Sequence, residues 1–116
     1  MMKKVSFAAM VFALANPEPE VDPEVARRHA KVVATGRSDY PNQINNVLAF
    51  PGVFRGLLDS GARDVDLAME AAAARALADV VRPDQLNAAF IVPSVFDPEV
   101  SQAVAEAVRT SVQARA

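Results

Sequence analysis

Two short apolar runs on either side of one short helix constrain the fold of this chain most. Residues 10–15 read as a buried strand because they form an uninterrupted apolar run. Residues 31–36 have the β-branched content and final glycine of a second strand. Between them, Asp22 is expected to cap a helix that has Pro23 at its first position. This order predicts a parallel sheet of the α/β class.

The second half of the chain is predicted to be helical. Helical spacing begins near Asn45, Pro51 is expected to restart the helix, and Gly61 is expected to end it. Gly52 and Gly56 form a GxxxG pattern that indicates close helix contact. The apolar positions predicted for this helix are Val47, Leu48, Phe50, Val53, Phe54, Leu57 and Leu58.

Two further helices follow, separated by an irregular segment at residues 82–98. The alanine-rich residues 65–81 have high helix propensity. Asp97, Pro98 and Glu99 repeat the helix-start chemistry of residues 22–24. The predicted apolar faces are Leu67, Ala71, Ala74, Ala78 and Val81 on the first helix, and Val100, Val104, Val108 and Val112 on the second.

These elements predict one α/β domain over residues 1–116, a partial Rossmann-like (doubly wound) fold with two or three short parallel strands and about four helices. Open α/β sheets bind ligands beyond the carboxyl ends of their strands. Asn16 and the polar loop at residues 36–46 both follow predicted strands. We therefore expect them at one rim of the sheet.

Composition excludes several classes of function. The net charge is −2 and the lysines and arginines form no run, so neither a nucleic-acid nor a membrane partner is expected. The sequence has no cysteine and one histidine, His29, so we expect neither a disulfide framework nor a zinc site.

The N-terminus supports two interpretations. Lys3 and Lys4, the apolar run that follows, and Ala13-Leu14-Ala15 resemble a secretory signal with a cleavage site. In that interpretation, the chain is a small exported helical binding protein with residues 1–15 as its signal peptide. The alternative is the buried strand described above.

Two long motifs resemble a known family. Residues 11–21 (VFALANPEPEV) and 32–56 (VVATGRSDYPNQINNVLAFPGVFRG) are similar to the C-terminal half of the NAD(P)-binding domain of bacterial malic enzymes. The similarity continues through residues 71–81 and 91–100. The resemblance implies an enzyme that oxidatively decarboxylates L-malate to pyruvate and CO2 with NAD or NADP and a divalent metal, Mg or Mn. It favours the strand over the signal peptide, and hence a cytoplasmic protein, because cleavage after Ala15 would separate Asn16 from its strand.

The resemblance also implies the residues of a site. Asn16, Asn45 and Asn46 are expected to contact the substrate, and Asn16 and Gly36 the cofactor. A neutral amide orients a carboxylate or hydroxyl but transfers no proton, so no catalytic residue is assigned. From the residues alone, Asn16 before Pro17 is a typical turn former, and Asn45 or Asn46 can cap a helix.

The residues between Gly36 and Asn45 are expected to have structural roles. Arg37 and Asp39 are predicted to form a local ion pair, and Tyr40 is predicted to stack or pack.

Several parts of the family's machinery do not occur in this sequence. None of its four glycines forms GxGxxG, and the family's metal-binding acids, lysine base and tyrosine acid are expected in preceding sequence. We therefore expect a fragment that is inactive alone. A partial sheet exposes an edge strand, which predicts a homo-oligomer. A noncatalytic piece that pairs with full-length malic enzyme is a further interpretation.

Overall fold

The computed structural model describes residues 8–15 and 18–115 of the 116-residue chain. They form two compact units: the described residues of Met1–Asn45 with Pro83–Val92, and those of Asn46–Arg82 with Pro93–Ala116. We call them the sheet unit and the helical unit. The assignment of residues 1–116 to one domain of a family stays a prediction, because compact units and family domains need not coincide.

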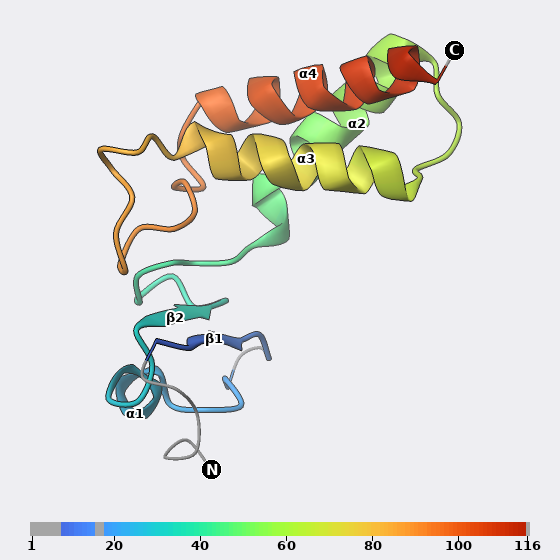
Figure 1. Cartoon of the computed structure of the whole chain (residues 1–116). Coiled ribbons are helices and arrows are strands. Elements are labelled where there is room, and N and C mark those ends of the chain that lie inside the picture. The colour runs from blue at the N-terminus through green and yellow to red at the C-terminus, as the bar shows by residue number, and fades with distance from the viewer. Residues whose placement is uncertain (1–7, 16–17, 116) are drawn as a thin grey trace. The chain divides into compact units, whose positions relative to one another are not determined.

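The sheet unit contains the predicted strand, helix and strand (Figure 1). Strand β1 (Met10–Ala13) pairs in parallel with β2 (Val32–Thr35), and α1 (Pro23–Arg27) lies between them in sequence. The Asp22 side chain accepts the backbone N–H of Glu24 at 2.9 Å, and Pro23 lies in the first turn of α1. The predicted capping is confirmed.

The small core of this unit joins the helix to the sheet. All of β2 is buried, as predicted. Ala26, Ala30 and Val33 form a buried cluster, against which Val11 and Val21 pack. The burial of β2 follows from its composition, because it is apolar at three of its four positions and its fourth, Thr35, is a small β-branched residue.

Strand β1 differs from its prediction in length and burial. The strand ends at Ala13, and Met10 and Phe12 are exposed, so the expectation of a buried strand over residues 10–15 is wrong in part. Alternate side chains of a strand face opposite sides of the sheet, and the buried Ala13 lies on the other side from Phe12. Residues 1–7 and 16–17, which include both lysines of the signal-like segment and Asn16, lie outside the described residues.

The helical unit comprises the 3₁₀ turn η2 (Asn46–Leu48) and the helices α2 (Phe50–Ser60), α3 (Leu67–Val80) and α4 (Glu99–Ala114). Pro51 lies in the first turn of α2, and Gly61 ends that helix with a left-handed φ of 71°. Both predictions are confirmed. The partial α/β fold class is also confirmed, with two parallel strands and four α-helices among the described residues.

Helix α4 packs against both α2 and α3, as Figure 1 shows. Gly52 and Gly56 of α2 face α4, where a Cβ on Gly52 would lie 2.6 Å from the Cβ of Val104. The predicted close contact at GxxxG is confirmed. The predicted valine stripe of α4 is buried at Val100, Val104 and Val108, and Val112 is half-buried.

The apolar faces predicted for α2 and α3 need correction. Phe50, Phe54 and Leu58 are exposed, because α2 contacts α4 through its glycines. On α3 the buried residues are Met69 and Ala73, whereas Leu67 is exposed. Alanines on every side of α3 leave its orientation undetermined by hydrophobic spacing.

Residues 83–98 form neither a helix nor a regular strand, as predicted, although one bridge joins Asn87 and Phe90. Of the helices in the part of the chain that the structure describes, none has the length and apolar character needed to span a bilayer.

Candidate functional site

The carboxyl ends of β1 and β2 align, so the described residues that follow each strand leave the sheet at one edge. Ala13 pairs with Thr35, so Leu14 and Gly36 leave the sheet side by side. The following loop returns to the same edge, because Ile44 donates its backbone N–H to the carbonyl of Thr35 at 2.8 Å. Asn45 is the next residue and therefore lies near Gly36.

The return of the loop adds one more parallel pairing to β2. Thr35 forms an isolated parallel bridge with Gln43 and donates its backbone N–H to the carbonyl of Asn42 at 3.3 Å. The Gln43 side chain contacts the carbonyl of Gly36 at 3.4 Å. The rim at the carboxyl end of β2 is thus built by segments 35–36 and 42–45.

The structure describes two of the three asparagines that are predicted to contact the substrate. Asn16 lies outside the described residues. Asn45 is exposed and ends the sheet unit, and Asn46 is exposed and begins η2 in the helical unit. Neither caps α2, because the N-cap of that helix is Ala49. The assignment of these residues to a substrate stays a prediction.

Asn42 has a buried side chain that forms three hydrogen bonds, and its role was not predicted from the sequence. It is 93% buried, with 7% of its surface exposed, and has a left-handed φ of 58°. Its amide donates to the carbonyls of Val33 and Ala88 at 3.0 and 2.8 Å and accepts the N–H of Ile91 at 2.9 Å. Asn42 therefore ties the end of β2 to residues 88–91. Asparagine tolerates this backbone conformation better than most residues, which is the signal available in the sequence.

The polar residues at the start of the loop stabilise it locally. Arg37 donates to both carboxylate oxygens of Asp39 at 2.9 and 2.6 Å, and its guanidinium lies 5.3 Å from the centre of the Tyr40 ring. The predicted ion pair and the predicted stacking of Tyr40 are confirmed. The hydrogen bond from Arg37 lowers the pKa of Asp39, which keeps this carboxyl ionised and unsuited to donate a proton.

The segment after β1 is also fixed by a carboxylate. Glu20 accepts the backbone N–H of Ala15 at 2.6 Å, and this bond lowers the pKa of Glu20. Ala15 and Glu20 are therefore held together by a charged hydrogen bond.

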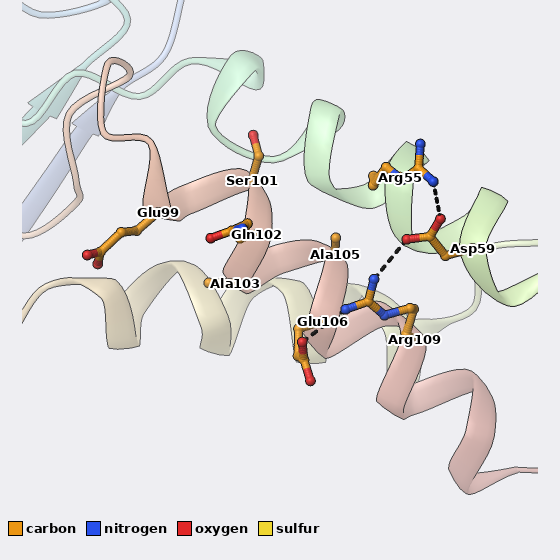
Figure 2. Close-up of a pocket in the computed structure, with 9 residues that line it drawn as sticks. All are labelled: Arg55, Asp59, Glu99, Ser101, Gln102, Ala103, Ala105, Glu106 and Arg109. Carbon is orange, nitrogen blue, oxygen red and sulfur yellow. Dashed lines mark hydrogen bonds and ion pairs between the residues drawn. The ribbon is translucent and has the colours of Figure 1, made fainter.

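A hollow of 710 Å³ lies between α2 and α4 in the helical unit (Figure 2). Asp59 accepts hydrogen bonds from Arg55 and from Arg109, the latter at 2.8 Å, and Arg109 also pairs with Glu106 at 2.9 Å. These hydrogen bonds, that from Arg55 first, lower the pKa of Asp59. Charges that neutralise one another in this way connect two helices and give no sign of acid or base chemistry.

No three metal-ligating side chains (His, Cys, Asp or Glu) converge on one point within residues 8–15 and 18–115. The rim segments 35–36 and 42–45 present the amide side chains of Gln43 and Asn45, which are groups that can bind and orient a ligand.

Comparison with known proteins identifies the family. The model of the malic enzyme NAD-binding domain matches residues 1–113. The chain belongs to this malic enzyme family. The NAD-dependent malic enzyme of Geobacillus stearothermophilus is 56% identical over 92% of this chain, and the NADP-dependent malic enzyme of Escherichia coli is 43% identical over 93% of it.

Solved structures of malic enzymes share the fold. The crystal structure of the malic enzyme from Pyrococcus horikoshii superposes with a TM-score of 0.92 at 47% identity over 98% of this chain. The chain spans 22% of the length of the Geobacillus enzyme, 16% of the Escherichia coli enzyme and 26% of the Pyrococcus chain. Malic enzymes are therefore several times longer than this chain.

Proposed function

We propose that this chain is part of an oxidoreductase that converts L-malate to pyruvate and CO2 with NAD or NADP. One observation carries the proposal. In a chain that matches the malic enzyme NAD-binding domain, Gly36 and Asn45 lie together at the carboxyl edge of a parallel sheet. This edge is where α/β folds bind their ligands.

The chain contributes orientation at this edge. Asn45 presents an amide that donates to a malate carboxylate or hydroxyl, and Asn16 and Asn46 are proposed to share this role. A hydrogen bond to a charged group contributes about 1.5–3 kcal/mol, which is sufficient to select one orientation of a small dicarboxylate. Asn16 and Gly36 are proposed to lie against the nicotinamide side of the cofactor. None of these groups moves a proton.

The residues present do not fit the other requirements of the reaction. The family implies a divalent metal, and the described residues contain no cluster of ligands for one. The sequence also contains no GxGxxG turn for a pyrophosphate. We therefore propose that the chain is inactive alone and that the metal, the acid and the base belong to other parts of a malic enzyme.

The proposal also covers the cellular location and the oligomeric state of the protein. Use of malate and NAD(P) suits the cytoplasm. The exposed β1 face, with Met10 and Phe12, favours a homo-oligomer or another assembly that covers it.

The proposal is tested with a chimera in which residues 1–113 replace the matched segment of the Geobacillus enzyme. The purified chimera should form NADH from malate and NAD with Mg²⁺ or Mn²⁺, whereas the isolated chain should not. The Geobacillus enzyme with the same segment deleted is the control. A folded chimera that binds NAD but does not oxidise malate would contradict the proposal.

A further inference from the structure

Asn42 combines burial with an unusual backbone conformation. Only 7% of its surface is exposed, and among the described residues it is the one non-glycine residue with a positive φ, 58°. Asparagine tolerates this region, but a residue keeps such a conformation only where its surroundings determine it strongly, which is most common at functional sites. Asn45, the residue proposed to orient malate, follows three positions later. The unusual conformation therefore lies directly before the proposed substrate contact.

The Asn42 side chain uses both its donor and its acceptor. Its NH2 group donates to the carbonyls of Val33 and Ala88 at 3.0 and 2.8 Å. Its carbonyl oxygen accepts the backbone N–H of Ile91 at 2.9 Å. A flipped amide would set its NH2 group against the N–H of Ile91, so the bonds to β2 and to the segment 88–91 select one orientation of the side chain.

The fixed orientation of Asn42 determines where the next residues run. The backbone carbonyl of Asn42 accepts the N–H of Thr35 at 3.3 Å, and two residues later Ile44 donates its N–H to the carbonyl of Thr35 at 2.8 Å. Residues 42–44 therefore lie against the end of β2, where Gln43 forms a parallel bridge with Thr35. Asn45 comes directly after the second bond. Its position relative to β2 is therefore set by the pairing that begins at Asn42.

The side-chain bonds of Asn42 anchor the segment that presents Asn45. Without them, residues 42–44 would keep the two backbone bonds to Thr35, of which the one at 3.3 Å is long. A displacement of about 1 Å at a group that positions a substrate can lower a rate about 100-fold. We propose that Asn42 is a positioning residue, which acts through Asn45 to orient malate for oxidation. This inference rests on the proposed function, because it takes Asn45 as the substrate contact.

A double-mutant cycle in the chimera tests the proposal. Asn42→Gly retains a residue that adopts a positive φ and removes the side-chain bonds. It should lower kcat/KM for malate at least about tenfold, but less than about twofold in the Asn45→Ala background, where the contact that it displaces is already absent. A loss of stability alone would be the same in both backgrounds.

The matched control for the cycle is Asn87→Gly, at an exposed asparagine of the same unit, which should leave kcat/KM unchanged. Circular dichroism at the assay temperature verifies that each variant is folded.

Hydrogen exchange in the isolated chain gives a measurement that needs neither the chimera nor a substitution. The amide of Ile91 is bonded to the Asn42 side chain, and the amide of Ile44 is bonded to Thr35. An anchored segment opens as one unit, so the protection factors of these two amides should agree within about threefold and respond equally to urea. Exchange of Ile44 more than about tenfold faster than that of Ile91 would show that the segment moves while Asn42 stays bonded, and would overturn the proposal.

The same measurement on Asn42→Gly shows the direction of the effect. The amide of Ile44 should exchange at least about tenfold faster than in the parent chain. The amide of Ala30, bonded to the carbonyl of Ala26 in the core of the sheet unit, is the internal control and should change much less.

The outcomes separate this inference from the proposed function. In an active chimera, equal losses of kcat/KM from Asn42→Gly in both backgrounds would overturn the inference and leave malate oxidation standing. Normal kinetics for Asn45→Ala would have the same consequence. In an inactive chimera, joint opening of the Ile44 and Ile91 amides would support the positioning of Asn45 by Asn42 and count against the proposed function alone.

Discussion

Gly52 of α2 and Val104 of α4 are so close that a Cβ on the glycine would lie 2.6 Å from the Cβ of the valine. One turn later, a Cβ on Gly56 would lie 2.7 Å from that of Val108. The backbone of α2 therefore contacts valine side chains of α4 at two successive turns. This contact determines which face of α2 is buried and which is left exposed.

We predict that Gly52→Ala and Gly56→Ala each destabilise the helical unit. Overpacking costs about 1–3 kcal/mol, and the higher helix propensity of alanine offsets up to about 1 kcal/mol of it. Urea unfolding followed by far-UV circular dichroism measures the change. A Gly52→Ala variant as stable as the parent would contradict the close contact.

We predict that Asn42 stabilises the rim of the sheet through its side chain. Asn42→Gly retains the left-handed backbone but removes the bonds to Val33, Ala88 and Ile91, which should cost about 2–4 kcal/mol because buried polar groups lose their partners. Asn42→Ala should cost about 1 kcal/mol more, from its positive φ.

The matched control for Asn42 is Asn87→Gly, at an exposed asparagine whose side chain bonds to Gln85 and Ala89. Chemical unfolding that reports on the sheet unit should show a much smaller change for this control. Equal losses of stability at the two positions would refute the prediction that the Asn42 side chain stabilises the rim.

We predict that Asp59 makes the helical unit sensitive to acid. Its folded pKa is lowered, first by the hydrogen bond from Arg55, so its contribution is present above the ordinary carboxyl pKa of about 3.9. The contribution should be lost as the pH falls from that value through the folded pKa. Asp59→Asn should flatten the dependence of the thermal midpoint on pH in this range.

Arg55→Gln should have part of the same effect as Asp59→Asn, because Asp59 keeps its bond to Arg109. Added salt should reduce the effect in the parent chain, since the groups are near the surface. An identical slope of midpoint against pH in the parent and in Asp59→Asn would count against the ion-pair network.

We predict that Glu20 protects the amide of Ala15. Glu20→Gln weakens the charged bond to this N–H, so the hydrogen exchange of Ala15 should become faster by up to about tenfold. Nuclear magnetic resonance measures the rate for this residue. The amide of Glu24, bonded to Asp22, is the internal control and should be unaffected.

We predict that Asn45 orients malate in an active chimera. Asn45→Ala should lower kcat/KM by about 10–100-fold, which corresponds to the loss of a hydrogen bond of about 1.5–3 kcal/mol to a charged group. Steady-state kinetics with malate as the varied substrate measures the loss. Asn87→Ala is the control, and near-normal kinetics for Asn45→Ala would remove Asn45 from the proposed site.

The sequence by itself determined the local elements of this protein. Asp22 with Pro23 begins α1, Gly61 ends α2, and the apolar residues of Val32–Thr35 form a buried strand, because each choice depends on groups within a few residues. The family could also be recognised from the sequence, because two long motifs around Asn16 and Asn45 resemble it.

Only the tertiary structure decided which faces are buried and which side chains stabilise the loop. The spacing of Phe50, Phe54 and Leu58 is that of a core face, yet Gly52 and Gly56 make the contact, because the close approach of two backbones favours the smallest residue over the most hydrophobic one. In the sequence, Asn42 is one of several polar residues in the loop, and only the fold shows that it bonds to Ala88 and Ile91. Partners almost fifty residues away leave no local pattern, so no local reading of the sequence finds them.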